Sequence, residues 1–216
     1  MDFRLYCCSC RDSERLIKLK MIYSANMTAG ALKPMESQVI AKLLSQGLTG
    51  AEACKTLLQE NALQTRSKAA AIRVGRMLIR RLEPMGSELW KLIVEGPHSV
   101  RIQALLVATV KSEALLADFL DLVVREQWTV MSEVLPRHTW PGFLDDCCGR
   151  DPNVATWSDS TRKKLGSAVF QCLEQAGYIE NKSTGKLQRV AIAPQVLDYL
   201  DRHHESHVRR CLEVAQ

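Results

Sequence analysis

The strongest constraint on the fold is a pair of apolar segments with helical spacing, at residues 99–110 and 113–128. Leucine, isoleucine and valine recur every three or four positions in both segments, which is typical of helices that bury one face. Lys111, Asp118 and Asp121 interrupt the apolar run, and a charge at the centre of a membrane-spanning helix is costly. We therefore expect two central helices of a bundle and no membrane span.

From residue 21 onward the chain carries further helical patterns, separated by glycine, proline or asparagine. Aromatic residues make up only 6% of the chain, and the abundant Leu, Ala, Glu and Lys favour helices over strands. Thr49 followed by Glu52 is a capping box that predicts a helix start, and Pro84 predicts a helix end. The predicted fold is mainly α, with helices near residues 36–46, 49–60, 65–83, 87–95, 99–110, 113–128, 139–148 and 158–176.

The pattern divides the chain into three parts. Residues 1–20 combine a cysteine cluster with mixed charge and no clear period, so we interpret them as an extension, either disordered or upstream of a true start at Met21. Residues 21–135 are predicted to form a helical bundle, and residues 136–216 a winged helix-turn-helix domain. The eight cysteines are interpreted as reduced thiols of a cytoplasmic protein, because the chain is long for a disulfide scaffold and has no recognisable signal peptide.

The predicted helix at residues 65–83 is unusually basic. It contains six Lys or Arg residues and only one acidic residue, so ion pairs within the helix cannot neutralise all six cations. Arg73, Arg76 and Arg80 recur at helical spacing and form a stripe on a different face from the apolar positions. Such a stripe suits the phosphates of a polyanion, and the alternatives are a solvated face or pairing with acids elsewhere in the fold. The candidate DNA contacts on this helix are Arg66, Lys68, Arg73, Arg76 and Arg80.

Residues 139–192 contain the parts of a winged helix-turn-helix in their usual order. A short helix, the turn RDPNVATW and a helix capped by Ser158 are followed by Gly177, which predicts a helix end. Residues 178–180 and 187–192 then predict the two strands of a short β-hairpin. The second helix of such a motif enters the major groove of DNA. The alternative is a winged helix that contacts another protein.

Cations are concentrated at the start of the proposed recognition helix and in its wing. Three cations in the first turns oppose the positive end of the helix dipole, and an anionic partner would remove that conflict. Lysine and serine at the groove-facing positions favour phosphate contacts over base reading, so affinity is expected to fall steeply with added salt. The candidate residues are Arg162, Lys163, Lys164 and Gln171 on the helix, and Lys182, Lys186 and Arg189 on the wing.

Catalysis and metal binding find little support in the sequence. The CCSC run at residues 7–10 lacks the usual C-x2-C spacing, and His203 and His207 share a helical face without an evident third ligand. Cys147 and Cys148 are adjacent and therefore point to different faces of a helix. Fingerprints of nucleotide-binding loops, hydrolases and zinc proteases are absent from the sequence. We expect a protein that is not an enzyme and that needs no cofactor or metal.

Several segments taken together resemble the BrxA family. They are YSANMTAGALKPMESQVIAKLLSQG, LWKLIVEG, LLADFLDLVVREQ and the series WPGFLDDCCGRDP, WSDSTRKKL, LEQAGYI and IAPQVLDYL. The resemblance covers about residues 21–216 and leaves residues 1–20 outside it. BrxA is a small helical protein encoded with BREX (bacteriophage exclusion) phage-defence systems.

The resemblance implies a DNA-binding accessory protein without a catalytic motif. It also implies a helical domain similar to the NusB antitermination bundle, helix-turn-helix elements, and other BREX proteins as partners, including a methyltransferase and a large ATPase. The leading hypothesis from residues and resemblance is therefore a double-stranded DNA-binding protein that works mainly through phosphate contacts. The alternative is an interaction subunit that docks acidic partners or RNA on the same basic faces.

Overall fold

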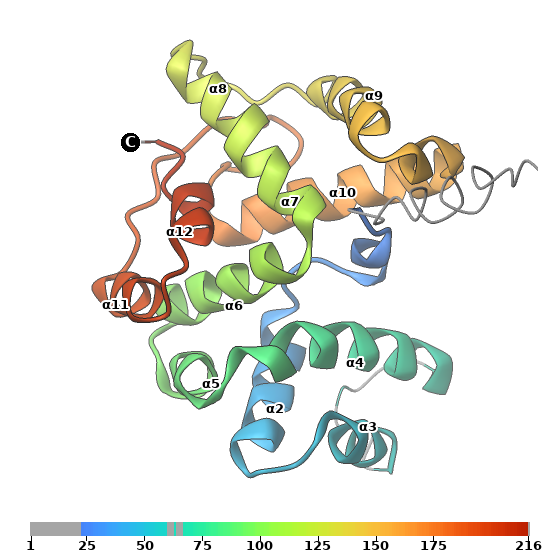
Figure 1. The fold of residues 1–216 in the computed structure, drawn as a ribbon, viewed down its shortest axis with the longest axis vertical. Helices are drawn as coiled ribbons and strands as arrows, with labels where there is room; N and C mark the ends of the chain where they lie inside the picture. The colour runs from blue at the N-terminus through green and yellow to red at the C-terminus, as the bar shows by residue number, and fades with distance from the viewer. Residues whose placement is uncertain (1–22, 60–62, 64–66, 216) are drawn as a thin grey trace, which may run out of the picture.

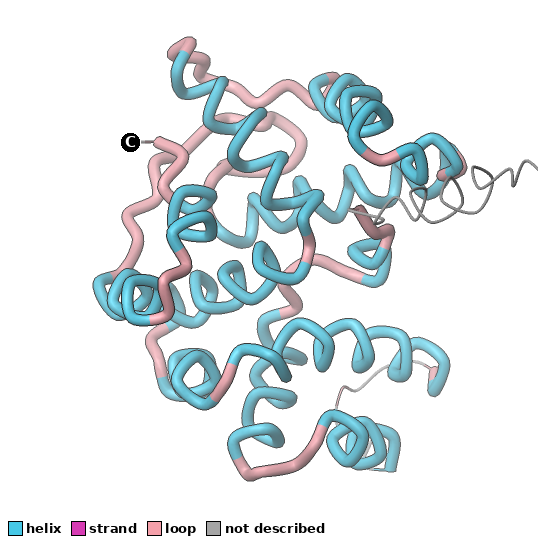
Figure 2. Tube along the Cα trace, viewed as in Figure 1, coloured by secondary structure: helices cyan, strands magenta, loops and turns pink. Residues whose placement is uncertain are grey.

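The computed structural model describes residues 23–59, 63 and 67–215 (Figure 1). Helices joined by short loops make up this part of the chain (Figure 2). The prediction of a mainly α fold is therefore confirmed. Arg66, one of the candidate DNA contacts, lies outside the described residues.

The first part of the fold contains most of the helices that the sequence predicts. Thr49 and Glu52 form the predicted capping box, because the Thr49 amide donates to the Glu52 carboxylate at 2.8 Å and the Glu52 amide donates to Thr49 Oγ1 at 3.3 Å. The helices are α2 (Pro34–Ser45), α3 (Gly50–Gln59), α4 (Lys68–Leu82), α5 (Ser87–Glu95) and α6 (His98–Ser112), with short 3-10 helices η1 (Asn26–Ala29) and η2 (Glu83–Met85).

The second apolar segment forms a continuous helical run whose middle is a π-helix. The run consists of α7 (Ala114–Asp118), the π-helix η3 (Phe119–Val124) and α8 (Arg125–Thr129). Phe119, at the start of η3, is fully buried and packs edge-on against Trp140 and Phe143, with ring centroids 5.4 and 5.2 Å apart. This aromatic cluster attaches the central run to the helices that follow it.

The last part of the chain contains α9 (Thr139–Arg150), the 3-10 helix η4 (Pro152–Thr156), α10 (Asp159–Ala176), α11 (Pro194–Arg202) and α12 (Ser206–Leu212). Ser158 caps α10 as predicted, since its side chain accepts a hydrogen bond from the Thr161 amide. Gly177 ends α10 in the left-handed conformation with φ of 83°, which suits a residue without a Cβ.

The predicted β-hairpin is reduced to isolated bridges, and the described residues contain no β-strand. Ile179 bridges Leu187, and Val134 bridges Lys186. The Leu135 amide donates to the Gly185 carbonyl at 2.8 Å, so three backbone segments meet here without forming a ladder. The backbone after Gln188 bonds to α6 instead, because the Gln103 side chain donates to the Ala191 carbonyl at 2.9 Å and accepts from the Ala193 amide at 2.7 Å.

Buried apolar side chains form one continuous cluster that runs through both predicted domains. Helix α6 lies at its centre, with α4 packed on one side and α10 on the other (Figure 1). The boundary between residues 135 and 136 stays a prediction, since the two parts share this core. None of the described helices combines the length and apolar character needed to cross a membrane.

Candidate nucleic-acid interface

The basic stripe on α4 lies on the outside of the molecule. Val74 and Leu78 face the core, while Arg73, Arg76 and Arg80 are exposed, as the helical spacing predicts. Lys68, at the first position of α4, is exposed as well. These three arginines are the predicted DNA contacts of that type that the structure describes on α4, and they share one solvent-exposed stripe.

The arginines of this stripe differ in how far they are neutralised. Arg80 forms an ion pair of 3.1 Å with Glu113, and 47% of its side chain remains exposed. Arg73 and Arg76 make no hydrogen bond or ion pair with any residue the structure describes. Among the described residues, two of these arginines thus have no partner for their charge, and the charge of the third is only partly compensated.

Arg81, the neighbour of Arg80, has a structural role. Its guanidinium is 2% exposed, lies 3.5 Å from Glu113 and donates to the Ala31 carbonyl at 2.7 Å. Burial lowers the pKa of Arg81, and the charge of Glu113 opposes that change. This arginine therefore ties α4 to the segment that carries η1.

On α10, Lys163 and Lys164 are exposed, and their ammonium groups have no ion-pair partner within the described ranges. Arg162 lies apart from them. Its guanidinium turns toward α9 and η4, donating to Asp145 at 3.3 Å and to the Val154 carbonyl at 3.3 Å, and only 25% of its side chain is exposed. The two lysines, rather than all three cations, form the basic surface at the start of α10.

The remaining predicted residues fall into two groups. Gln171 is exposed two turns after the lysines on the same side of α10 and lines the same surface hollow. Lys182, Lys186 and Arg189 follow the C-terminal end of α10, which is about 20 Å along the helix axis from Lys163, and the Lys182 amide donates to the Glu174 carboxylate at 3.2 Å. Lys186 pairs with Glu180 at 3.9 Å, and the Arg189 guanidinium stacks over the Trp128 ring at 5.5 Å.

The short helix η1 lies between the two basic surfaces (Figure 1). A hollow of about 580 Å³ separates η1 from α4 and is lined by Thr28, Arg73, Arg76 and Arg80 among others. A second hollow of about 280 Å³ separates η1 from α10 and is lined by Thr28, Gly30, Lys163, Lys164, Ser167, Ala168 and Gln171. The structure thus brings together two cation sets that are about ninety positions apart in the sequence.

Hydrogen bonds from distant parts of the chain hold η1 in this position. The Tyr23 amide donates to Asp151 at 2.9 Å, Ser24 Oγ donates to Glu113 at 3.0 Å, and the Leu32 amide donates to the Gln175 side chain at 3.0 Å. Sequence reasoning missed η1, for which the turn-forming Asn26 and Gly30 were the available signal.

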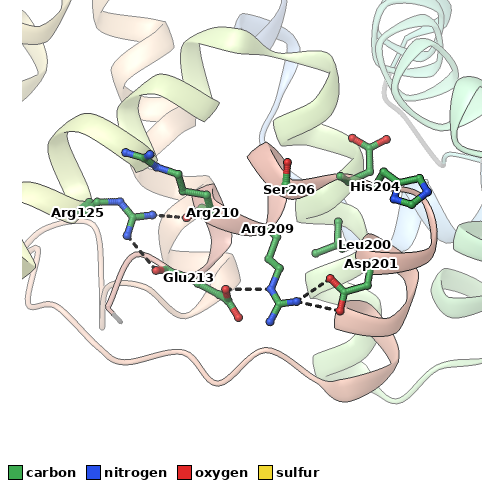
Figure 3. Close-up of a pocket in the computed structure, with 9 residues that line it drawn as sticks. Arg125, Leu200, Asp201, His204, Ser206, Arg209, Arg210 and Glu213 are labelled. Atoms are coloured by element: carbon green, nitrogen blue, oxygen red, sulfur yellow. Dashed lines mark hydrogen bonds and ion pairs between the residues drawn. The ribbon is translucent and has the colours of Figure 1, made fainter.

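A hollow of about 600 Å³ on another part of the surface has a different electrostatic character. It lies between α11 and α12, beside α8, and its arginines are bound to carboxylates or carbonyls (Figure 3). Arg209 donates to both oxygens of Asp201 and to Glu213, and Arg125 donates to the Glu213 carbonyl. Since these cations are neutralised locally, the hollow is a weaker candidate for a polyanion.

The thiols and histidines of the described residues form no evident reactive centre. Cys211 Sγ lies 3.8 Å from His207 Nε2, but burial raises the pKa of this thiol to about 12. Burial raises the pKa of Cys147 to about 11 and that of Cys172 to about 12, so both stay protonated near neutral pH. His203 contacts Glu88 at 3.0 Å, and His207 belongs to the next helix. In the described ranges, no three His, Cys, Asp or Glu side chains gather as a metal site would need.

Comparisons with known proteins agree on one family. A model of the BrxA family matches residues 21–204, which begin where the predicted extension ends. A protein named BREX protein BrxA from Paramagnetospirillum magneticum is 41% identical over 193 residues, which cover 89% of this chain and 97% of the relative. Another BREX protein BrxA, from Escherichia coli O9:H4, is 29% identical over 198 residues and covers 92% and 93% of the two chains.

A solved structure shows the same fold. The crystal structure of an uncharacterized protein from Magnetospirillum magneticum superposes with a TM-score of 0.83 at 40% sequence identity. The superposition covers 89% of this chain and 99% of that one.

Proposed function

The chain belongs to the BrxA family, and from this premise we propose that it is a non-enzymatic, double-stranded DNA-binding component of a BREX phage-defence system. The relatives are named BREX proteins, which supports a place among other BREX proteins as partners. DNA binding is proposed on the charge distribution of this chain.

The observation that carries the proposal is the set of unpaired cations on one side of the molecule. Arg73 and Arg76 on α4, with Lys163 and Lys164 on α10, are exposed and lack ion-pair partners within the described residues. Holding unpaired like charges near one another is unfavourable, and a polyanion removes that cost while its condensed counterions are released. Phosphates are therefore the ligand groups that fit this surface best.

The order of elements around α10 supports a winged helix-turn-helix. Helix α9, the turn through η4 and α10 follow one another as helix, turn and helix, and the bridged segment after α10 takes the place of a short wing. Lys163, Lys164 and Gln171 lie on the exposed side of the proposed recognition helix. The first part of the chain would then supply the NusB-like bundle and the α4 stripe.

Gel retardation at several salt concentrations tests the proposal. If Arg73, Arg76, Arg80, Lys163 and Lys164 each contact a phosphate, a plot of the logarithm of the binding constant against the logarithm of the salt concentration should have a slope of about −4.5. Random and defined duplexes should bind similarly, because phosphate contacts carry no sequence information. Affinity without salt dependence would contradict the mechanism.

Charge-reversal variants locate the surface. Arg73→Glu with Arg76→Glu, and separately Lys163→Glu with Lys164→Glu, should each weaken binding and reduce the salt slope by about 2. The matched control is Lys42→Glu with Lys91→Glu, which reverses two exposed charges on α2 and α5 that line neither hollow. The control should bind DNA like the parent.

The second candidate function is an interaction subunit that docks acidic partners or RNA. It is favoured by the carboxylate pairs that Arg80, Arg162 and Lys186 already form, which show that these side chains can bind carboxylates. If both double reversals bind DNA like the parent while association with other BREX proteins fails, this second function is the correct one. Tighter binding of RNA than of duplex DNA would identify RNA as the ligand.

A further inference from the structure

Resting on the proposed function, we infer that the α4 and α10 faces bind one DNA duplex together, with Thr28 of η1 lying against the DNA backbone between them. The starting observation is that Thr28 lines both the hollow beside α4 and the hollow beside α10. Thr28 is exposed, and the hydrogen bond that its hydroxyl makes within the described residues goes to the Ala25 carbonyl, at 2.8 Å. The two hollows therefore adjoin at this residue, and a DNA backbone that runs directly from one hollow to the other passes over it.

The lining of the two hollows favours continuous contact with a polyanion. Together they present five cations, on α4 and α10, and the described residues that line them include no Asp or Glu. Glu113, the acid bound to Arg80, is 1% exposed and lies beneath the surface. By contrast, the hollow between α11 and α12 contains Asp201, Glu205 and Glu213 among its lining residues. A duplex thus meets attraction on both sides of η1 and no exposed carboxylate within these linings.

The two faces are held at a fixed separation before any ligand binds. The segment around η1 is bonded to α4 through Arg81, which donates to the Ala31 carbonyl, and to α10 through Gln175, which accepts from the Leu32 amide. A surface that needs no rearrangement loses less conformational entropy on binding than two independently moving sites. Once one face has bound the duplex, the second face meets the same duplex at a high effective concentration.

Two variants at one position test the inference. Thr28→Glu introduces a negative charge between the faces, and Thr28→Gln introduces a side chain of the same size without charge. Because a like charge about 4 Å from a phosphate in water costs about a factor of five in affinity, Thr28→Glu should bind a short random duplex about fivefold more weakly than Thr28→Gln. Thr28 is exposed, so both variants should fold, which circular dichroism checks.

Stoichiometry gives a second test that needs no variant. In sedimentation experiments with a short duplex in excess, one chain should take up one duplex, because both faces share it. Uptake of two duplexes per chain, or equal affinity of Thr28→Glu and Thr28→Gln, would overturn the inference while DNA binding itself stands. If the parent chain binds no duplex at low salt, both the inference and the proposed function are wrong.

Discussion

Two neighbouring arginines on α4 have opposite environments. Arg80 is 47% exposed, whereas Arg81 is 2% exposed, yet both contact the buried carboxylate of Glu113. Adjacent helical residues point in directions about 100° apart, so one faces solvent and the next reaches the interior. The buried arginine joins the fold of the N-terminal segment to α4, and the exposed one remains available to a ligand.

We predict that Arg81→Met lowers the free energy of unfolding by about 3 kcal/mol, because removing one partner of a buried ion pair leaves the other charge poorly compensated. Chemical denaturation measures the change. Arg80→Met is the matched control on the same helix and should cost much less, since that side chain is half exposed. Equal stability of Arg81→Met and the parent would refute the structural role assigned to Arg81.

At the scale of elements, the contact between α9 and α10 depends on a glycine. A Cβ added at Gly166 of α10 would lie 2.7 Å from the Cδ1 atom of Trp140 on α9. The Trp140 ring is buried, and its Nε1 donates to the Arg162 carbonyl at 3.0 Å, so it has little freedom to move away. Close approach of the two helices of the proposed helix-turn-helix therefore requires a residue without a side chain at this position.

We predict that Gly166→Ala destabilises the protein by about 1–3 kcal/mol, the usual cost of overpacking a core. Gly142→Ala on α9 is the control, because a Cβ there meets no atom within 4 Å. Alanine has the higher helix propensity, so the control should stabilise by up to about 1 kcal/mol. Thermal unfolding of both variants measures the difference, and the opposite order would show that Trp140 yields to the added methyl group.

At the scale of the whole molecule, the two predicted domains are joined by shared packing. Helix α6 contacts α4 in the first part and α10, α11 and α12 in the second, and the buried side chains form one cluster. The Tyr199 hydroxyl also donates to the Met85 carbonyl at 3.1 Å, linking α11 to η2 across 114 positions. Such packing couples the stability of the two parts.

We predict a single cooperative unfolding transition, with coincident midpoints for helix content and tryptophan fluorescence. The four tryptophans of the chain lie in both predicted parts, so fluorescence reports on each of them. Arg81→Met and Gly166→Ala should both shift the whole transition, although they lie in different parts. Two separated transitions, each moved by one substitution, would instead indicate independent domains divided near residue 135.

Helix boundaries and caps were predictable because they depend on residues within a turn of one another. The capping box at Thr49, the cap at Ser158 and the stop at Gly177 follow from side chains next to the backbone groups that they satisfy or from local backbone freedom. The exposure of Arg73 and Arg76 followed from helical spacing alone. Local residue patterns were therefore sufficient to predict the helices and most of the cationic positions on α4 and α10.

The pairing of the cations and the relation between the two faces depend on long-range packing, which those local patterns do not specify. Arg162 turns inward to Asp145 and Val154, and the predicted strands shorten to bridges. Helix η1 occupies its place between α4 and α10 through contacts such as that of Leu32 with Gln175, which are 143 positions apart. Pairing and placement of this kind depend on distances between side chains far apart in the chain, and local sequence patterns contain no information on those distances.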